Sequence, residues 1–174
     1  MPDAGAIMAN EQDPDFIIAR VFDAPRQTVW QAMTEAERMK QWWGPTGYKV
    51  TTATMDFRPG GVFHCGMTSI EGHKLWGRFV YREIADGERV VFLNAFSNAG
   101  GEVKRHPIVP TWPLETLTTV TFTGAGEGKT EVAVYCTPHD ANPLERQTFT
   151  ASVGAVRLAW TGTFDQLARY LAKG

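Results

Sequence analysis

The chain has 174 residues, 43% of them hydrophobic and 21% charged, which is enough for a globular domain with a sizeable core and argues against a disordered chain. Its formal net charge is -2 and no run of lysine or arginine occurs, which argues against nucleic-acid binding through a basic surface. No apolar run approaches the ~18 residues of a membrane span and no signal-peptide pattern is present, so we expect a cytoplasmic protein with no membrane partner.

Residues 1–14 are expected to form a short flexible tail, and residues 15–174 a single domain. The domain opens with an apolar, partly β-branched run at 16–22, which predicts a strand. Pro25 suits the first turn of a short helix, with Asp23 as its N-cap. A second short helix is expected from Thr34, where Glu37 completes the pattern of a capping box.

The sequence QWWGPTGY at 41–48 ends that second helix. Two tryptophans in the last helical turn are followed by Gly44-Pro45, which cannot continue a helix. Adjacent helical residues point about 100° apart, so Trp42 and Trp43 cannot both face the core. We expect one of them to close the core and the other to line or rim a cavity.

Alternation with period two dominates from Tyr48 to Thr137 and predicts an antiparallel meander with short turns, several of them rich in glycine. The expected strands lie at about 48–57, 61–70, 74–84, 89–97, 114–123 and 130–137. On the last two of them, the covered face should hold Val120, Phe122, Val132 and Val134. Asp56 and Arg58, beside one of the turns, are expected to form a structural ion pair or to support the turn.

One connection is too long for a turn. The loop at 98–113, NAGGEVKRHPIVPTWP, holds three prolines and little strand pattern, and long loops of this kind often carry function. We expect it to fold over a pocket as a lid.

A single helix is expected from Pro143 to the C-terminus, with Asn142 at its start. Apolar residues recur along it at steps of three and four, and the residues expected to face the sheet are Phe149, Val153, Val156 and Trp160. Gly162 suggests close packing or a slight bend. These elements together predict an α+β fold in which a curved sheet grips a long helix and leaves an apolar cavity.

Several ordered motifs carry a family resemblance. They include ARVFDAPRQTVWQAMTEAERMKQWWGP at 19–45, MDFRPGGVFHCGM at 55–67 and WTGTFDQLARYLAK at 160–173. Over residues 15–172 the chain resembles the SRPBCC (START/Bet v 1-like) superfamily, in the branch of activator-of-Hsp90-ATPase homologues and calicheamicin-resistance-like proteins. One departure is Ala159-Trp160, where the superfamily pattern usually has Gly-Trp.

The resemblance implies a helix-grip fold: a curved antiparallel sheet wrapped around a long C-terminal helix, with two short helices after the first strand. It does not fix the function, because the superfamily includes ligand carriers, cyclases, self-resistance proteins and co-chaperone domains.

The candidate ligand-binding residues are aromatic, apolar or polar side chains expected near the cavity: Trp42, Trp43, His64, Arg78, His106, Trp112, Val120, Phe122, Phe149, Val153, Val156 and Trp160. His64, His106 and Glu115 are also candidates for general acid–base catalysis, because histidine and carboxylate side chains near one cavity can exchange protons with a substrate.

No metal site or cofactor is expected, since the four histidines lie in different elements without metal-ligand spacing. Cys65 and Cys136 are expected to be buried thiols in a reducing compartment.

Three functions stay open. The first is binding of a small hydrophobic molecule, aromatic or lipid-like, between sheet and helix. The second is a cyclase- or hydrolase-type enzyme that uses His64, His106 and Glu115. The third is a homodimeric interaction or stress-related module, with an edge strand or the tryptophan-bearing loop at the interface.

Overall fold

The alternating segments between Tyr48 and Thr137 form one antiparallel sheet in the computed structural model, which describes residues 14–173. The strands are β1 (Phe16–Phe22), β2 (Tyr48–Met55), β3 (Val62–Ser69), β4 (Lys74–Ala85), β5 (Arg89–Ser97), β6 (Val103–Lys104), β7 (Glu115–Gly124) and β8 (Thr130–His139). Their order across the sheet is β1-β8-β7-β5-β4-β3-β2, and β6 pairs with the end of β5. The expected strands are therefore confirmed, with bounds shifted by at most two residues. The tail expected at 1–14 lies, except for Pro14, outside the described residues.

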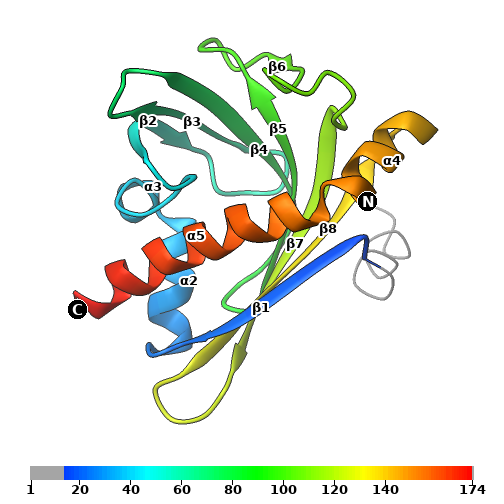
Figure 1. Ribbon diagram of the computed structural model, residues 1–174. Helices are drawn as coiled ribbons and strands as arrows, with labels where there is room; N and C mark the ends of the chain where they lie inside the picture. Colours follow the sequence, from blue (N-terminus) through cyan, green and yellow to red (C-terminus); the bar gives the residue numbers. More distant parts are fainter. Residues whose placement is uncertain (1–13, 174) are drawn as a thin grey trace.

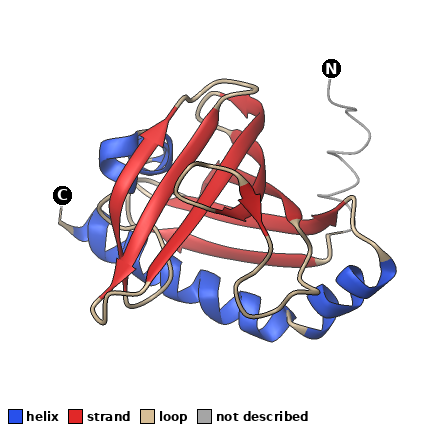
Figure 2. Cartoon of the chain, turned by 90° about the horizontal axis from the view of Figure 1, so that it is seen from above, coloured by secondary structure: helices blue, strands red, loops and turns tan. Residues whose placement is uncertain are grey.

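The sheet is curved, and two irregularities in its register contribute to the bend. The pairing of β2 with β3 shifts between Val50 and Thr52, and that of β4 with β5 shifts between Tyr81 and Glu83. An extra residue on one strand bends it and increases its twist. Figure 2 shows the strands curving over the long C-terminal helical segment.

The concave face of the sheet carries the core. The four residues expected on the covered face of β7 and β8 are all buried: Val120, Phe122, Val132 and Val134. Their register partners continue the same face across the sheet, with Val120 opposite Val90 on β5 and Val134 opposite Ile18 on β1. On the surface, Asp56 and Arg58 form the expected ion pair at 2.8 Å, with both side chains exposed.

The two short helices follow β1 as expected: α2 (Arg26–Thr34) and α3 (Ala36–Met39). Their expected caps are wrong. Pro25, not Asp23, is the N-cap residue of α2, and no side chain caps that helix. Thr34 ends α2 instead of starting α3, because its buried hydroxyl donates a 2.8 Å hydrogen bond to the carbonyl of Trp30.

The C-terminal segment is two helices, α4 (Pro143–Ala151) and α5 (Val153–Ala172), so the expectation of one continuous helix is wrong. The start is confirmed, since Asn142 and Glu145 form a reciprocal capping box. The break falls at Ser152, with φ −102° and ψ 7°, in a stretch of threonine, serine and valine with low helix propensity. Figure 1 shows α4 leaving the direction of α5, which crosses the open side of the curved sheet.

Gly162 lets α5 pack closely on the turn before β2. A Cβ atom there would lie 2.4 Å from the hydroxyl oxygen of Thr46, so the close approach expected at this glycine is confirmed. None of the helices in residues 14–173 combines the length and the hydropathy that crossing a membrane requires.

Candidate functional site

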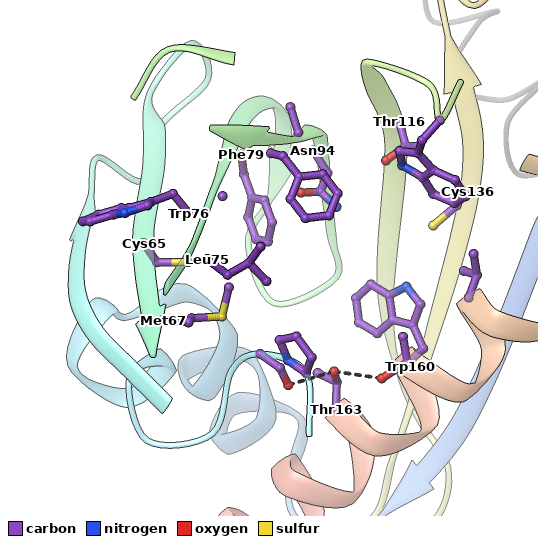
Figure 3. Close-up of a pocket in the computed structure, with 18 of the residues that line it drawn as sticks. Cys65, Met67, Leu75, Trp76, Phe79, Asn94, Thr116, Cys136, Trp160 and Thr163 are labelled. Atoms are coloured by element: carbon purple, nitrogen blue, oxygen red, sulfur yellow. Dashed lines mark hydrogen bonds between the residues drawn. The ribbon is translucent and has the colours of Figure 1, made fainter. Parts of the chain in front are cut away.

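A cavity of about 260 Å³ lies between the concave face of the sheet and the C-terminal helices (Figure 3). The register of the strands explains its wall. Cys65 of β3 and Phe79 of β4 face inward. Phe79 pairs with Asn94 of β5, and Asn94 pairs with Thr116 of β7, so the same face continues across the sheet. Val156 and Trp160 of α5 complete the wall from the other side. Residues far apart in the sequence therefore meet around one space because they share one face of the sheet.

The lining is mainly apolar, rich in aromatic rings and uncharged. Aromatic rings that reach it come from the turn before β2, from β4 and β5, from the long loop and from both C-terminal helices: Trp43, Phe79, Phe96, Trp112, Phe149 and Trp160. Within the described chain, no charged side chain lines this cavity. An apolar space of this size, slightly below the ~300–1,000 Å³ typical of ligand pockets, suits a small uncharged molecule.

The tryptophan pair divides as the sequence suggested. Trp42 is 3% exposed and its indole N–H donates a 3.0 Å hydrogen bond to the carbonyl of Ala32, so it belongs to the core. Trp43 lines the cavity, with its ring edge-to-face on Phe79 at 5.3 Å between centroids. Both follow the end of α3 at Met39, so the expectation that they lie within the helix is wrong.

The turn that carries the pair is fastened to α5. The side-chain amide of Gln166 donates to the carbonyls of Trp42 and Gly44, at 2.8 and 2.7 Å, and the hydroxyl of Thr163 donates to Gly44 at 3.2 Å. Gly44 has φ +116°, and a Cβ atom there would lie 2.6 Å from the sulfur of Met67. This glycine therefore allows the chain to turn tightly into β2 against the cavity wall.

Of the candidate ligand-binding residues, five line the cavity: Trp43, Trp112, Phe149, Val156 and Trp160. Four others lie away from it in or against the core: Trp42, Val120, Phe122 and Val153. In β7, Val120 and Phe122 share the face of Thr116 but lie farther along the strand, where only a void of about 10 Å³ remains between the sheet and the two short helices.

His64 and Arg78 lie on the opposite face of the sheet from the cavity. They are register partners on β3 and β4, and their immediate neighbours Cys65 and Phe79 face inward. His64 Nε2 is 3.1 Å from the carbonyl oxygen of Asn98, and Arg78 donates at 2.9 Å to the carbonyl of Gly101. The geometry gives these two residues a role in holding the start of the long loop.

His106 helps to shape the loop that closes one side of the cavity. Its Nδ1 accepts 3.0 Å hydrogen bonds from the backbone N–H groups of Ile108 and Val109, and its ring contacts Phe96 and Trp112. Burial lowers the pKa of the imidazole, which favours the neutral form that accepts these bonds. Nδ1 is therefore occupied by the loop's own backbone.

The three catalytic candidates do not converge. Glu115 precedes the inward-facing Thr116 on β7 and so faces outward, with His139 as its register partner. In residues 14–173, no hydrogen bond or ion pair joins His64, His106 and Glu115 to one another, and no group of three or more metal-ligating side chains is placed to hold a metal ion.

A buried carboxylate that the sequence analysis did not single out ties the long loop to α4. Glu145 is 7% exposed, and it accepts from Arg105 at 2.8 Å and from the backbone N–H of Leu114 at 3.3 Å. The hydrogen bond from Arg105, followed by the backbone bond from Asn142, lowers the pKa of this carboxyl. The spacing Asn142-x-x-Glu145, a capping-box pattern, was the signal in the sequence.

Several cavity residues were also missed, including Cys65, Met67, Asn94, Thr116 and Cys136. Alternation along β3, β5, β7 and β8 assigns each of them to the inward face, so the same reasoning used for Val120, Phe122, Val132 and Val134 could have found them. Burial raises the pKa of both thiols to about 12, which leaves them protonated and consistent with the buried thiols expected.

Comparison with known families gives one match that spans most of the chain. The model of the family described as "Activator of Hsp90 ATPase homolog 1-like protein" matches residues 23–172. The chain belongs to this family. The resemblance seen in the sequence motifs, to the activator-of-Hsp90-ATPase-homologue branch of the SRPBCC superfamily, is thereby confirmed.

Solved structures of other bacterial proteins share the helix-grip fold of this family member. A protein from Arthrobacter aurescens matches with a TM-score of 0.73 at 22% identity, covering 91% of this chain and 86% of that one. A protein from Nitrosomonas europaea matches with a TM-score of 0.69 at 24% identity, covering 91% and 94%. The AHSA1 protein from Silicibacter pomeroyi matches with a TM-score of 0.70 at 16% identity, covering 90% and 96%. A comparison with curated proteins found no match. At these identities the shared feature is the fold.

Proposed function

We propose that this protein binds a small hydrophobic molecule, aromatic in character, in the cavity between the sheet and the C-terminal helices. The observation that carries the proposal is the cavity of about 260 Å³ with its uncharged, mainly apolar lining, which is rich in aromatic rings. A space lined by rings favours planar apolar molecules, since ring pairs attract in offset or edge-to-face arrangements beyond their buried area.

The supports of the cavity fit this role. The tryptophan-bearing turn is held by Gln166 and Thr163, and the long loop is held by Glu145, so two of its walls are tied to the C-terminal helices. A preformed site spends less binding free energy on ordering side chains. The catalytic alternative finds less support, because His64 and Glu115 project from the other face of the sheet.

The test is native mass spectrometry of the protein purified from cells, followed by denaturing extraction of any bound molecule. The expected result is a mass increment that disappears on denaturation and belongs to a small apolar compound. The same spectrum reports the number of subunits, which tests the homodimer prediction.

A matched pair of variants makes the result specific to the cavity. Val156→Phe adds volume to the cavity wall and should abolish the mass increment, whereas Ala155→Phe, on the exposed side of the same helix, should leave it unchanged. An increment that survives Val156→Phe would place the ligand elsewhere and overturn the proposal.

A further inference from the structure

Two polar side chains stand side by side in the otherwise apolar wall of the cavity. Asn94 of β5 and Thr116 of β7 are register partners, and both point to the inner face of the sheet (Figure 3). Thr116 is 7% exposed and Asn94 is half-buried. Strand pairing fixes the backbone of both residues, so the two side chains start from fixed neighbouring positions on the cavity wall.

Neither side chain has a partner in the described part of the chain. No hydrogen bond joins the amide of Asn94 or the hydroxyl of Thr116 to any residue from 14 to 173. The contrast with Thr118, the next inward residue of β7, is direct, because its hydroxyl lies 3.6 Å from the sulfur of Cys136. Neither residue is among those whose side-chain N or O atoms are fully buried without a partner, so the polar atoms of the pair are open to the cavity. A ligand group that reproduces the hydrogen bonds of cavity water can therefore bind to them.

The chemistry of the pair limits what that partner can be. An asparagine amide both donates and accepts hydrogen bonds, and so does a threonine hydroxyl. Together they match a group that also does both, such as a hydroxyl or an amide. Because no charged side chain lines the cavity, a carboxylate, sulfonate or ammonium group would enter without a counter-charge and would be strongly disfavoured.

We propose that Asn94 and Thr116 form the polar recognition element of the cavity, and that the ligand is a neutral aromatic molecule whose hydroxyl or amide group hydrogen-bonds to them. This inference rests on the proposed function and narrows it. The rings of Phe79 and Phe96 flank the pair in the sheet, with Phe79 directly opposite Asn94. The aromatic ring of the ligand could therefore contact these phenylalanines while its hydroxyl or amide group bonds to Asn94 and Thr116.

The experiment compares two probes of nearly the same shape, 2-naphthol and 2-methylnaphthalene, by equilibrium dialysis against the full chain. The variants are Asn94→Leu, Thr116→Val and the double variant, each checked for folding by thermal unfolding. For each protein we take the ratio of the two affinities. The change in this ratio from wild type to variant cancels the constant difference in hydrophobicity between the probes. In the double variant the 2-naphthol affinity, relative to that of 2-methylnaphthalene, is expected to fall about tenfold, as for two neutral hydrogen bonds.

Thr121→Val is the matched control, because Thr121 lies on the outer face of the same strand and does not line the cavity. It should leave the ratio unchanged. Naphthalene-2-sulfonate, which stays anionic, should bind the wild type at least a hundredfold more weakly than 2-naphthol.

Each other outcome has a definite meaning. If both neutral probes bind and the affinity ratio is the same in the wild type and the double variant, the proposed function stands but the polar recognition element is wrong. In that case water, not the ligand, would satisfy the hydrogen bonds of Asn94 and Thr116. Sulfonate binding as tight as that of 2-naphthol would overturn the requirement for a neutral ligand. If neither neutral probe binds the wild type, the cavity does not accept small aromatic molecules and the proposed function fails together with the inference.

Discussion

The indole rings of Trp43 and Trp160 meet edge to face, with their centroids 5.7 Å apart, and join the turn before β2 to the middle of α5. Trp160 continues this contact to Phe164 at 5.6 Å, and Trp43 continues it to Phe79 of β4. The aromatic wall of the cavity is thus continuous with the packing that holds the helix on the sheet. Ligand binding and stability are expected to share residues here, and variants can separate them.

Trp42→Ala should mainly lower stability, whereas Trp43→Ala should mainly weaken ligand binding. Trp42 is a fully packed core residue, and its truncation should lower the free energy of unfolding by about 3–5 kcal/mol. Trp43→Ala should cost less, since this residue is half-buried, but it should weaken binding of an aromatic probe such as 2-naphthol. Urea unfolding and equilibrium dialysis measure the two effects. Equal losses of stability, with no change in binding for Trp43→Ala, would contradict the division of roles.

Gly66→Ala should destabilise the protein through one contact on the outer face of the sheet. The added Cβ atom would lie 2.7 Å from ring atoms of Trp76, which covers Gly66 and stacks on His64 at 5.1 Å. We expect a loss of about 1–3 kcal/mol in the free energy of unfolding. In a Trp76→Ala background the same substitution should cost almost nothing, so a double-mutant cycle by urea unfolding tests the pair. Additive effects would show that the ring is not the cause.

Glu145 should make stability depend on pH in acid. Its pKa is held below the ordinary value of 4.5 by the hydrogen bond from Arg105, so the folded state favours the ionised carboxylate. This stabilisation is fully present above pH 4.5, the ordinary pKa of the carboxyl. It is lost as the pH falls from 4.5 through the lower pKa that the carboxyl has in the folded state. Urea unfolding across this range should show a shallower loss for Glu145→Gln than for the wild type. The same slope in both proteins would mean that other carboxyls control the acid response.

Cys65 and Cys136 should be unreactive in the folded protein although both line the cavity. With pKa values of about 12, on the order of one thiol in ten thousand is ionised at a pH of about 8, and the thiolate is the reactive form. A thiol-reactive disulfide reagent should therefore modify both cysteines in denaturant and neither on the same timescale in the native state. Rapid modification of the native protein would contradict this.

The sequence predicted more of the fold than of the site. Alternation and glycine turns located the strands to within two residues, because each strand has one buried face and its pattern repeats every second residue. Helix ends were less predictable. Thr34 fits an N-cap pattern, but in the folded protein its hydroxyl bonds to the preceding turn, and the break at Ser152 has only a modest local propensity signal.

Some site residues were accessible to sequence reasoning. Trp43, Trp112 and Trp160 were expected near the cavity, and all three line it. His64 and Glu115 were also expected near the cavity but face away from it, because adjacent residues of a strand point to opposite faces and their neighbours Cys65 and Thr116 face inward.

The sequence by itself determined the strand pattern, the inward parity of each strand and the family, because these depend on local periodicity and on ordered motifs. The tertiary structure alone decided that Asn94 stands opposite Thr116, that Glu145 anchors Arg105 across 40 positions of sequence, and that Gln166 fastens the turn after Trp42. Strand register and helix docking set these contacts, and both depend on how the whole curved sheet closes around α5. Local sequence patterns do not report how the sheet closes around α5. The set of residues that line the cavity could therefore be read only from the folded structure.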